Sequence, residues 1–178
     1  MLLTDAQRDL RSVYLAGAPG IFVSGMVWLA AGLVALNRSP RAGMLALFLG
    51  GMLIHPLSVM LTKALGRSAA PAKQNTLVRM GLETVPSLIV GFALAYVASS
   101  VRLEWFFPAM LLVIGARYLA FQTLFGQRVY WLLGGVLLAA GWLLYKLQAP
   151  FAAGAFTGAA IEVVFAMVVF AMGRREGR

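Results

Sequence analysis

Three ionisable side chains stand near the middle of long apolar stretches of the sequence. His55, Arg117 and Glu162 each lie eleven to thirteen residues into a predicted membrane-spanning segment. A charged side chain at the bilayer centre costs on the order of 2.5–3.5 kcal/mol on insertion scales, so such residues normally face a partner or a cavity. Because Arg117 and Glu162 carry opposite charges, we expect them to pair, since a lone buried charge is far costlier than a pair.

This polar set is compatible with two kinds of site. An Arg–Glu pair can be purely architectural, or the same groups can line a polar cavity that binds a solute or relays a proton. His55 favours the cavity, because an unperturbed imidazole titrates near neutral pH, although a single histidine beside Pro56 is also typical of a hydrogen-bonded core residue. Tyr118 is placed to contribute a hydroxyl next to Arg117.

Glu83 is a further carboxylate inside an apolar segment, about a quarter of the way along it. It is either a second, more cytoplasmic site or the ion-pair partner of a nearby base, Lys63 or Arg79. We favour the ion pair over the second site.

The residues needed for common catalytic or metal chemistry are scarce. The chain has no cysteine and one histidine, which excludes disulfides and thiolate sites and disfavours His-rich metal or haem sites. It contains no H-E-x-x-H, no G-x-S-x-G and no phosphate-binding glycine loop. Ser58, on the helical face of His55, is a weak candidate nucleophile. We therefore predict no catalytic residue, no metal and no cofactor, and favour a non-enzyme.

Composition predicts the elements that must position these side chains. The chain has 178 residues, of which 61% are hydrophobic and 12% charged, whereas about a quarter of residues are charged in a soluble domain. The apolar runs approach the roughly 20 residues that cross a bilayer. We predict an all-α, polytopic membrane helix bundle forming a single integral membrane domain over residues 1–178. The six spans are expected at about 13–36, 43–65, 77–99, 105–125, 129–147 and 151–173.

The N-terminal residues predict a short interfacial helical start before the first span. Thr4 and Gln7 have the spacing of a capping box, with Thr4 as the N-cap. Gly17, Pro19 and Gly20 follow, and they predict a kink or break, because proline removes a backbone donor and glycine permits close approach.

Two proline and glycine features occur later in the chain. Pro56 predicts a kink at the centre of the second span. Gly154 and Gly158 present a small-residue face at four-residue spacing in the last span, leading toward Glu162. Such faces let membrane helices approach closely, here within one subunit or between two, so a homo-oligomer is plausible.

Lysine and arginine residues predict that both termini lie in the cytoplasm. In that orientation ten basic residues are cytoplasmic and four are external, in keeping with the positive-inside rule. The cytoplasmic set is Arg8, Arg11, Lys63, Arg67, Lys73, Arg79, Arg128, Arg174, Arg175 and Arg178, and the external set is Arg38, Arg41, Arg102 and Lys146.

The formal net charge of +9 does not predict nucleic-acid binding, because the basic residues sit between apolar runs. There they orient helices and meet anionic lipid headgroups. The expected partners are the lipid bilayer and an unidentified small-molecule solute.

Several short motifs together resemble a bacterial multi-pass membrane protein family of unknown function. They are Gly17-Ala-Pro-Gly20, Trp28, Ile54-His55-Pro56-Leu57 and Gly115-Ala-Arg-Tyr118-Leu-Ala-Phe121. The resemblance covers most of the chain. It implies a compact integral membrane fold and brings no activity and no catalytic residues.

The sequence therefore favours a multi-pass protein of the bacterial inner membrane with a buried Arg/Glu/His polar centre. The leading hypothesis is a small-solute or proton-coupled permease. A non-transporting structural or regulatory membrane protein is the alternative, and an intramembrane lipid-acting enzyme is a weaker one. A permease requires a hydrated route to the polar centre, a structural pair requires a dry enclosure, and a lipid enzyme requires a lateral opening at His55 or Glu83.

Overall fold

A computed structural model describes residues 1–176 of the chain, and their side chains as far as residue 173. The described part is helical and contains no strand. Six segments are long and apolar enough to cross a membrane, which confirms the all-α prediction of six spans. The side chains of Arg174, Arg175 and Arg178, which entered the count of basic residues, lie outside the described part.

The helices follow one another with short connections, apart from one loop of residues 65–76. Their bounds are α1 Leu3–Tyr14, η1 Leu15–Gly17, α2 Ala18–Asn37, α3 Pro40–Ala64, α4 Leu77–Glu83, α5 Val85–Val101, η2 Leu103–Trp105, α6 Phe106–Phe125, α7 Val129–Lys146 and α8 Phe151–Glu176.

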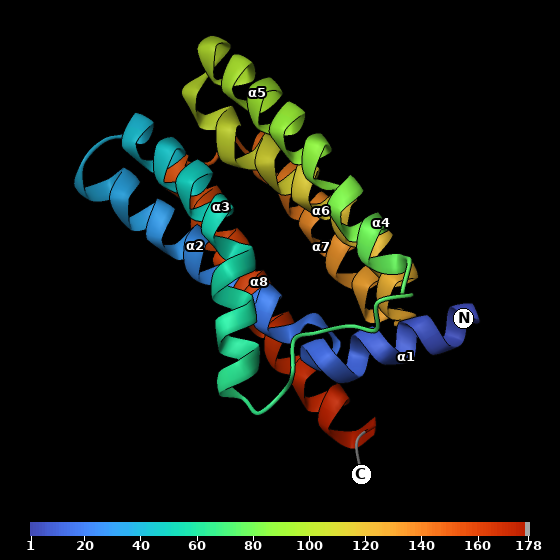
Figure 1. Cartoon of the computed structure of the whole chain (residues 1–178). Coiled ribbons are helices and arrows are strands. Elements are labelled where there is room, and N and C mark those ends of the chain that lie inside the picture. The colour runs from blue at the N-terminus through green and yellow to red at the C-terminus, as the bar shows by residue number, and fades with distance from the viewer. Residues whose placement is uncertain (177–178) are drawn as a thin grey trace.

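Two groups of helices make up the bundle (Figure 1). In one group α2 packs along both α3 and α8, and in the other α6 packs along α7 while α5 leans on α6. Contacts of α8 with α6 and α7 join the groups. The start of α1, the end of α8 and the loop of residues 65–76 lie at one end of the bundle, as an even number of spans requires (Figure 1).

Small residues allow the closest helix pairs to form. A Cβ added at Gly134 of α7 would lie 2.7 Å from the carbonyl oxygen of Gly115 of α6, so these backbones nearly touch. A Cβ at Gly43 of α3 would lie 2.9 Å from the carbonyl oxygen of Ala31 of α2. Helices in lipid gain little from burying apolar surface against each other, so close backbone approach of this kind supplies much of their attraction.

The first span is broken at residues 15–17, between α1 and α2. Leu15, Ala16 and Gly17 all have left-handed backbone angles, with φ of 50°, 53° and 85°, and the Tyr130 hydroxyl donates a hydrogen bond to the Ala16 carbonyl. Pro19 stands in the first turn of α2, where its missing N–H would have had no helical partner. The break thus precedes the proline.

Helix α1 is an amphipathic segment whose buried side consists of Ala6 and Leu10. It begins at Leu3 with Leu2 as the N-cap and no side-chain cap, so the predicted capping box does not form. Gln7 instead donates a hydrogen bond of 2.8 Å to the Thr123 carbonyl of α6.

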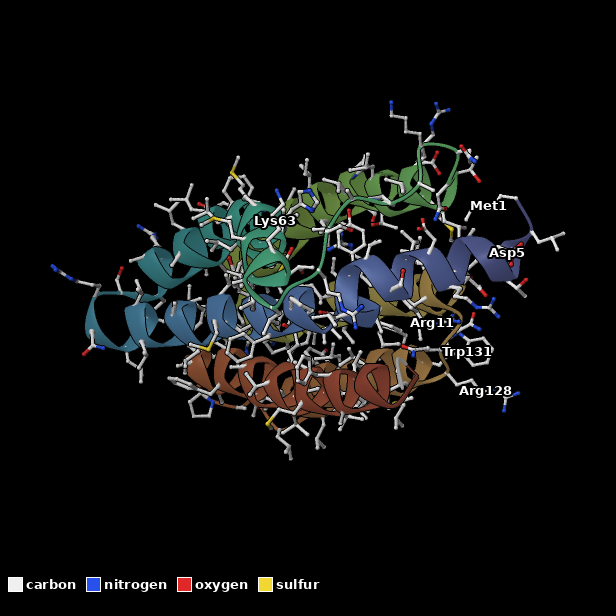
Figure 2. All side chains as sticks on the ribbon, turned by 60° about the horizontal axis from the view of Figure 1, so that its bottom comes forward. Met1, Asp5, Arg11, Lys63, Arg128 and Trp131 are labelled. Carbon is white, nitrogen blue, oxygen red and sulfur yellow. The ribbon has the colours of Figure 1, made fainter. Side chains whose placement is uncertain are left out.

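Hydrogen bonds tie α1 to both connections at its end of the bundle. Arg11 donates to the Phe125 carbonyl at the end of α6, close to the α6–α7 turn that carries Arg128 (Figure 2). Asn75 of the long loop donates to the Ala6 carbonyl and to the Asp9 carboxylate, at 3.0 and 2.8 Å. The N-terminal helix therefore belongs to the folded bundle.

Helices α3 and α5 form the loosely packed side of the bundle. Their direct contacts lie near one end, where the rings of Phe48 and Phe92 are 4.8 Å apart and the Ser99 hydroxyl approaches the Met44 sulfur at 4.0 Å. Helix α3 continues through Pro56, whereas the third span is interrupted at Thr84, between α4 and α5.

Candidate functional site

Glu162 lies at the centre of the bundle, on the face of α8 that packs against α2 and α6. Its side chain has 0% exposure. Ser24 and Trp28 of α2 and Tyr118 of α6 carry polar groups close enough to interact with the carboxylate, yet neither carboxylate oxygen has a partner in hydrogen-bond geometry. The site is therefore an enclosed acid group ringed by potential donors that do not satisfy it.

The indole of Trp28 shares this condition. Trp28 is fully buried and its Nε1 has no hydrogen-bond partner. Buried polar groups without partners are rare in folded proteins, because each forfeits its hydration. Two such groups side by side at the centre of a membrane bundle set this region apart from an ordinary packed core.

Glycines bring α8 close enough to α2 and α6 to enclose the site. A Cβ at Gly158 would lie 2.8 Å from the Trp28 ring, and one at Gly154 would lie 2.6 Å from the Phe107 Cβ of α6. From the other side, a Cβ at Gly25 of α2 would lie 2.9 Å from Val163 of α8. The small-residue face of α8 thus packs within the chain.

Arg117 stands beside the enclosure but is turned away from the carboxylate. Its side chain is half-buried, its Nε donates a hydrogen bond of 3.0 Å to the Thr84 hydroxyl, and its guanidinium lies 5.0 Å from the centre of the Phe121 ring. Its charge still acts on Glu162 through space.

The hydrogen-bonded ion pair between Arg117 and Glu162 is absent, since neither oxygen of Glu162 accepts a hydrogen bond. Successive helical residues point about 100° apart. Tyr118 therefore faces α8, while Arg117 points toward the junction of α4 and α5. The predicted pair rested on the opposite charges of the two residues and did not consider the directions in which their side chains point.

Thr84 provides the acceptor for Arg117 because the third span breaks there. The Thr84 hydroxyl also donates to the Gly81 carbonyl at 2.7 Å, and Pro86 occupies the first turn of α5. Thr84, Ser24 and Trp28 were not among the residues predicted for the centre. Pro86 was a usable signal for the break, and the four-residue spacing of Ser24 and Trp28 places them on one helical face.

The structure places the remaining candidates outside the enclosure. His55 is exposed on α3, and its carbonyl accepts a hydrogen bond from Ser58. Glu83 is exposed at the end of α4, next to Thr84. The centre is thus built from Glu162, Tyr118, Trp28 and Ser24, with Arg117 adjacent and His55 apart.

Gly20 and the first-span break also lie away from the carboxylate. A Cβ at Gly20 would meet only the Ser58 Cβ, at 3.9 Å, so this glycine is not needed for close packing. At Gly17 a Cβ would collide with the Tyr130 hydroxyl and the Phe125 ring. This collision and the positive φ of Gly17 both favour glycine there.

The enclosed centre offers one ionisable oxygen group and three potential hydrogen-bond donors. Among the described residues, no group of three or more His, Asp or Glu side chains is gathered in a way that could hold a metal ion. The chemistry open to the centre is proton binding by the Glu162 carboxylate, with Arg117 as an adjacent positive charge.

Comparison with known proteins identifies a family for this chain. Neither the curated proteins nor the solved structures contain a significant match. The chain matches the sequence profile of DUF7010, a family of unknown function, over residues 3–172. This match spans nearly the whole chain and confirms the expectation of an uncharacterised family. The chain therefore belongs to the DUF7010 family.

Proposed function

We propose that this protein is a proton-coupled permease for a small solute, with Glu162 as the proton-binding group. The observation that carries the proposal is the enclosure of the Glu162 carboxylate without a hydrogen bond. An ionised carboxylate in this enclosure has lost its hydration without gaining a hydrogen bond, so its burial is unfavourable. A protonated carboxyl is neutral and fits the same enclosure, so the site is suited to binding and releasing a proton.

Arg117 is the second element of the proposal. It lies next to the enclosure, hydrogen-bonded to Thr84 at the break in the third span. When Glu162 loses its proton, the Arg117 guanidinium acts on it as a compensating positive charge, and moving toward the carboxylate requires the guanidinium to leave Thr84. Proton release at Glu162 would thereby be coupled to the α4–α5 junction, where interrupted helices commonly take part in transport. An anionic solute group would compete for Arg117.

We place the protein in the bacterial inner membrane with both termini in the cytoplasm. The end that bears α1 and the loop of residues 65–76 carries most of the basic residues. This distribution supports the orientation, because loops rich in Lys and Arg remain cytoplasmic during insertion.

Flux measurements in proteoliposomes test the permease. Purified protein is reconstituted with an internal pH-sensitive dye, and a panel of small anions is added outside with and without a pH gradient. We expect solute-dependent proton movement with the wild type and its loss with Glu162→Gln, which keeps the side-chain volume but cannot release a proton. Glu83→Gln is the matched control, since Glu83 is exposed and lies outside the centre.

Absence of flux for every solute and for protons would contradict the permease and favour a non-transporting protein. Unchanged flux in Glu162→Gln would contradict the role of Glu162 as the proton-binding group. A parallel loss of flux in Glu83→Gln would also contradict that role, because it would point to a general effect of removing a carboxylate.

A non-transporting structural or regulatory membrane protein is the second candidate. It is favoured by the complete enclosure of Glu162 between α2, α6 and α8, which leaves no open route to the carboxylate in this conformation. This candidate predicts that Glu162→Gln alters thermal stability or assembly while no solute is transported.

A further inference from the structure

A groove lies between α3 and α5 at the end of the bundle opposite the termini. It has a volume of about 190 Å³ and is lined by Arg41, Met44, Leu45, Phe48, Phe92 and Tyr96. This volume is below the roughly 300 Å³ of typical enclosed small-molecule sites. A groove of this size suits part of a long, flexible molecule that extends beyond it.

The lining of the groove is amphipathic in a definite order. Arg41 stands in the first turn of α3, at the water-facing end, and exposed Tyr96 faces it from the last part of α5. Phe48 and Phe92 follow deeper in the bundle, with their rings in contact at 4.8 Å. A basic and a hydroxyl group thus stand above an aromatic floor, as in membrane-interface anchoring belts.

The charge at this end favours an anionic ligand. No carboxylate lines the groove. Arg38 and Arg102 stand in the turns next to α3 and α5, and Glu104 of η2 is the acidic residue of these turns, outside the lining. A phosphate group at headgroup depth would meet an excess of positive charge.

The space below the groove is open to the membrane. Leu49 and Met52 of α3 and Ile89 of α5 are exposed to between 50 and 66%, so both helices present apolar side chains beyond the Phe48–Phe92 contact. In a bilayer, such surfaces are covered by acyl chains or by another protein. The acyl chains of a lipid whose headgroup binds Arg41 would extend directly over these side chains.

We propose that this groove, lined by Arg41, Phe48, Phe92 and Tyr96 between α3 and α5, binds one anionic phospholipid. Its phosphate accepts hydrogen bonds from the Arg41 guanidinium and the Tyr96 hydroxyl, and its acyl chains lie along the aromatic floor. A second groove in the bundle lacks such polar groups and serves as a comparison. It has the same volume, lies between α2, α3 and α8 near Leu65, and is lined entirely by apolar residues, so it has no group that could select a headgroup.

Native mass spectrometry of the full chain tests the site. Protein in detergent is titrated with phosphatidylglycerol or with phosphatidylcholine of the same acyl chains, and bound lipids are counted. We expect one phosphatidylglycerol to be retained in preference to phosphatidylcholine. Arg41→Gln should lower that preference about fivefold, the size of one basic group's attraction to an anionic headgroup.

Arg128→Gln is the matched control, because Arg128 is an exposed arginine beyond the opposite end of the bundle. It should leave the preference unchanged. Phe48→Ala should reduce retention of both lipids, since it removes the shared floor. An equal loss of preference in Arg128→Gln, or no preference in the wild type, would overturn the proposal. So would a change in oligomeric mass in Arg41→Gln without a change in lipid count, which would assign the groove to a second copy of the chain.

Discussion

Helices α2 and α3 are equally apolar, yet they occupy opposite environments. The most apolar stretch of 18 residues in the first span, which contains α2, has a mean hydropathy of 1.9, and 50% of it is buried. The corresponding stretch of α3 has a mean hydropathy of 2.0, and 11% of it is buried, the same share as in the third span. Mean hydropathy therefore predicts that both helices can span a membrane, but it does not predict which of them is packed inside the bundle.

Small residues and their partners account for the difference. The side of α2 that meets α8 presents Gly25 and Gly32, where an added Cβ would lie within 3.1 Å of α8 atoms. Helix α3 meets α2 through Gly43 and Gly50 on one face, whereas an added Cβ at Gly51 would have no atom within 4 Å. In lipid, exposed apolar side chains carry no penalty, so a helix becomes central only where its surface permits close contact. The enclosed Glu162 lies on the packed side, and His55 lies on the open side.

A larger side chain at one glycine of the packed side and at one glycine of the open side should have the most different effects on stability. Gly158→Leu would force a side chain into Trp28 and Leu111, which lie 2.8 and 3.0 Å from an added Cβ. We expect a loss of about 3 kcal/mol of unfolding free energy, as for overpacked cores. Gly51→Leu faces open space and should change stability by less than about 0.5 kcal/mol. Thermal unfolding in detergent measures both, and equal losses would contradict the proposed division.

The hydrogen bond between Arg117 and Thr84 joins the packed side to the open side. Thr84→Val keeps the shape of the side chain but removes the acceptor of the Arg117 Nε. We expect destabilisation of about 1–2 kcal/mol, because a half-buried charged donor loses its partner. Ser87→Ala, which removes an exposed hydroxyl from the same region of α5, is the control. If both variants melt alike, the bond contributes nothing to holding α5 in place.

The smallest expected effect is the coupling between Arg117 and Glu162. A double-mutant cycle with Arg117→Ala and Glu162→Ala should give a coupling energy of about 0.5–1 kcal/mol, since the two charges interact through space without a hydrogen bond. Strict additivity would mean that the charges are independent. A coupling of about 3 kcal/mol or more would indicate the direct pair that this structure lacks. Unfolding free energies of the single and double variants supply the measurement.

Some features of the centre followed from residue type and depth. Glu162 and Tyr118 are polar residues far inside apolar spans, and the structure brings both to one place. The partner of Arg117 did not follow from depth, because depth leaves rotation about the helix axis undetermined. Residues 117 and 118 are neighbours in sequence, but they point to different helices. His55 shows the same limitation, since its position along α3 carried no information on which face of α3 is packed.

The sequence by itself determined that this chain has six segments long and apolar enough to cross a membrane, with a carboxylate and an arginine deep inside two of them. Span length and the cost of buried charge are local properties, so composition and position along the chain were sufficient. Only the tertiary structure decided that Glu162 is enclosed by Ser24, Trp28 and Tyr118 while Arg117 is held by Thr84. Those contacts depend on how helices rotate and approach one another, and close backbone contacts at Gly25, Gly154 and Gly158 set that approach.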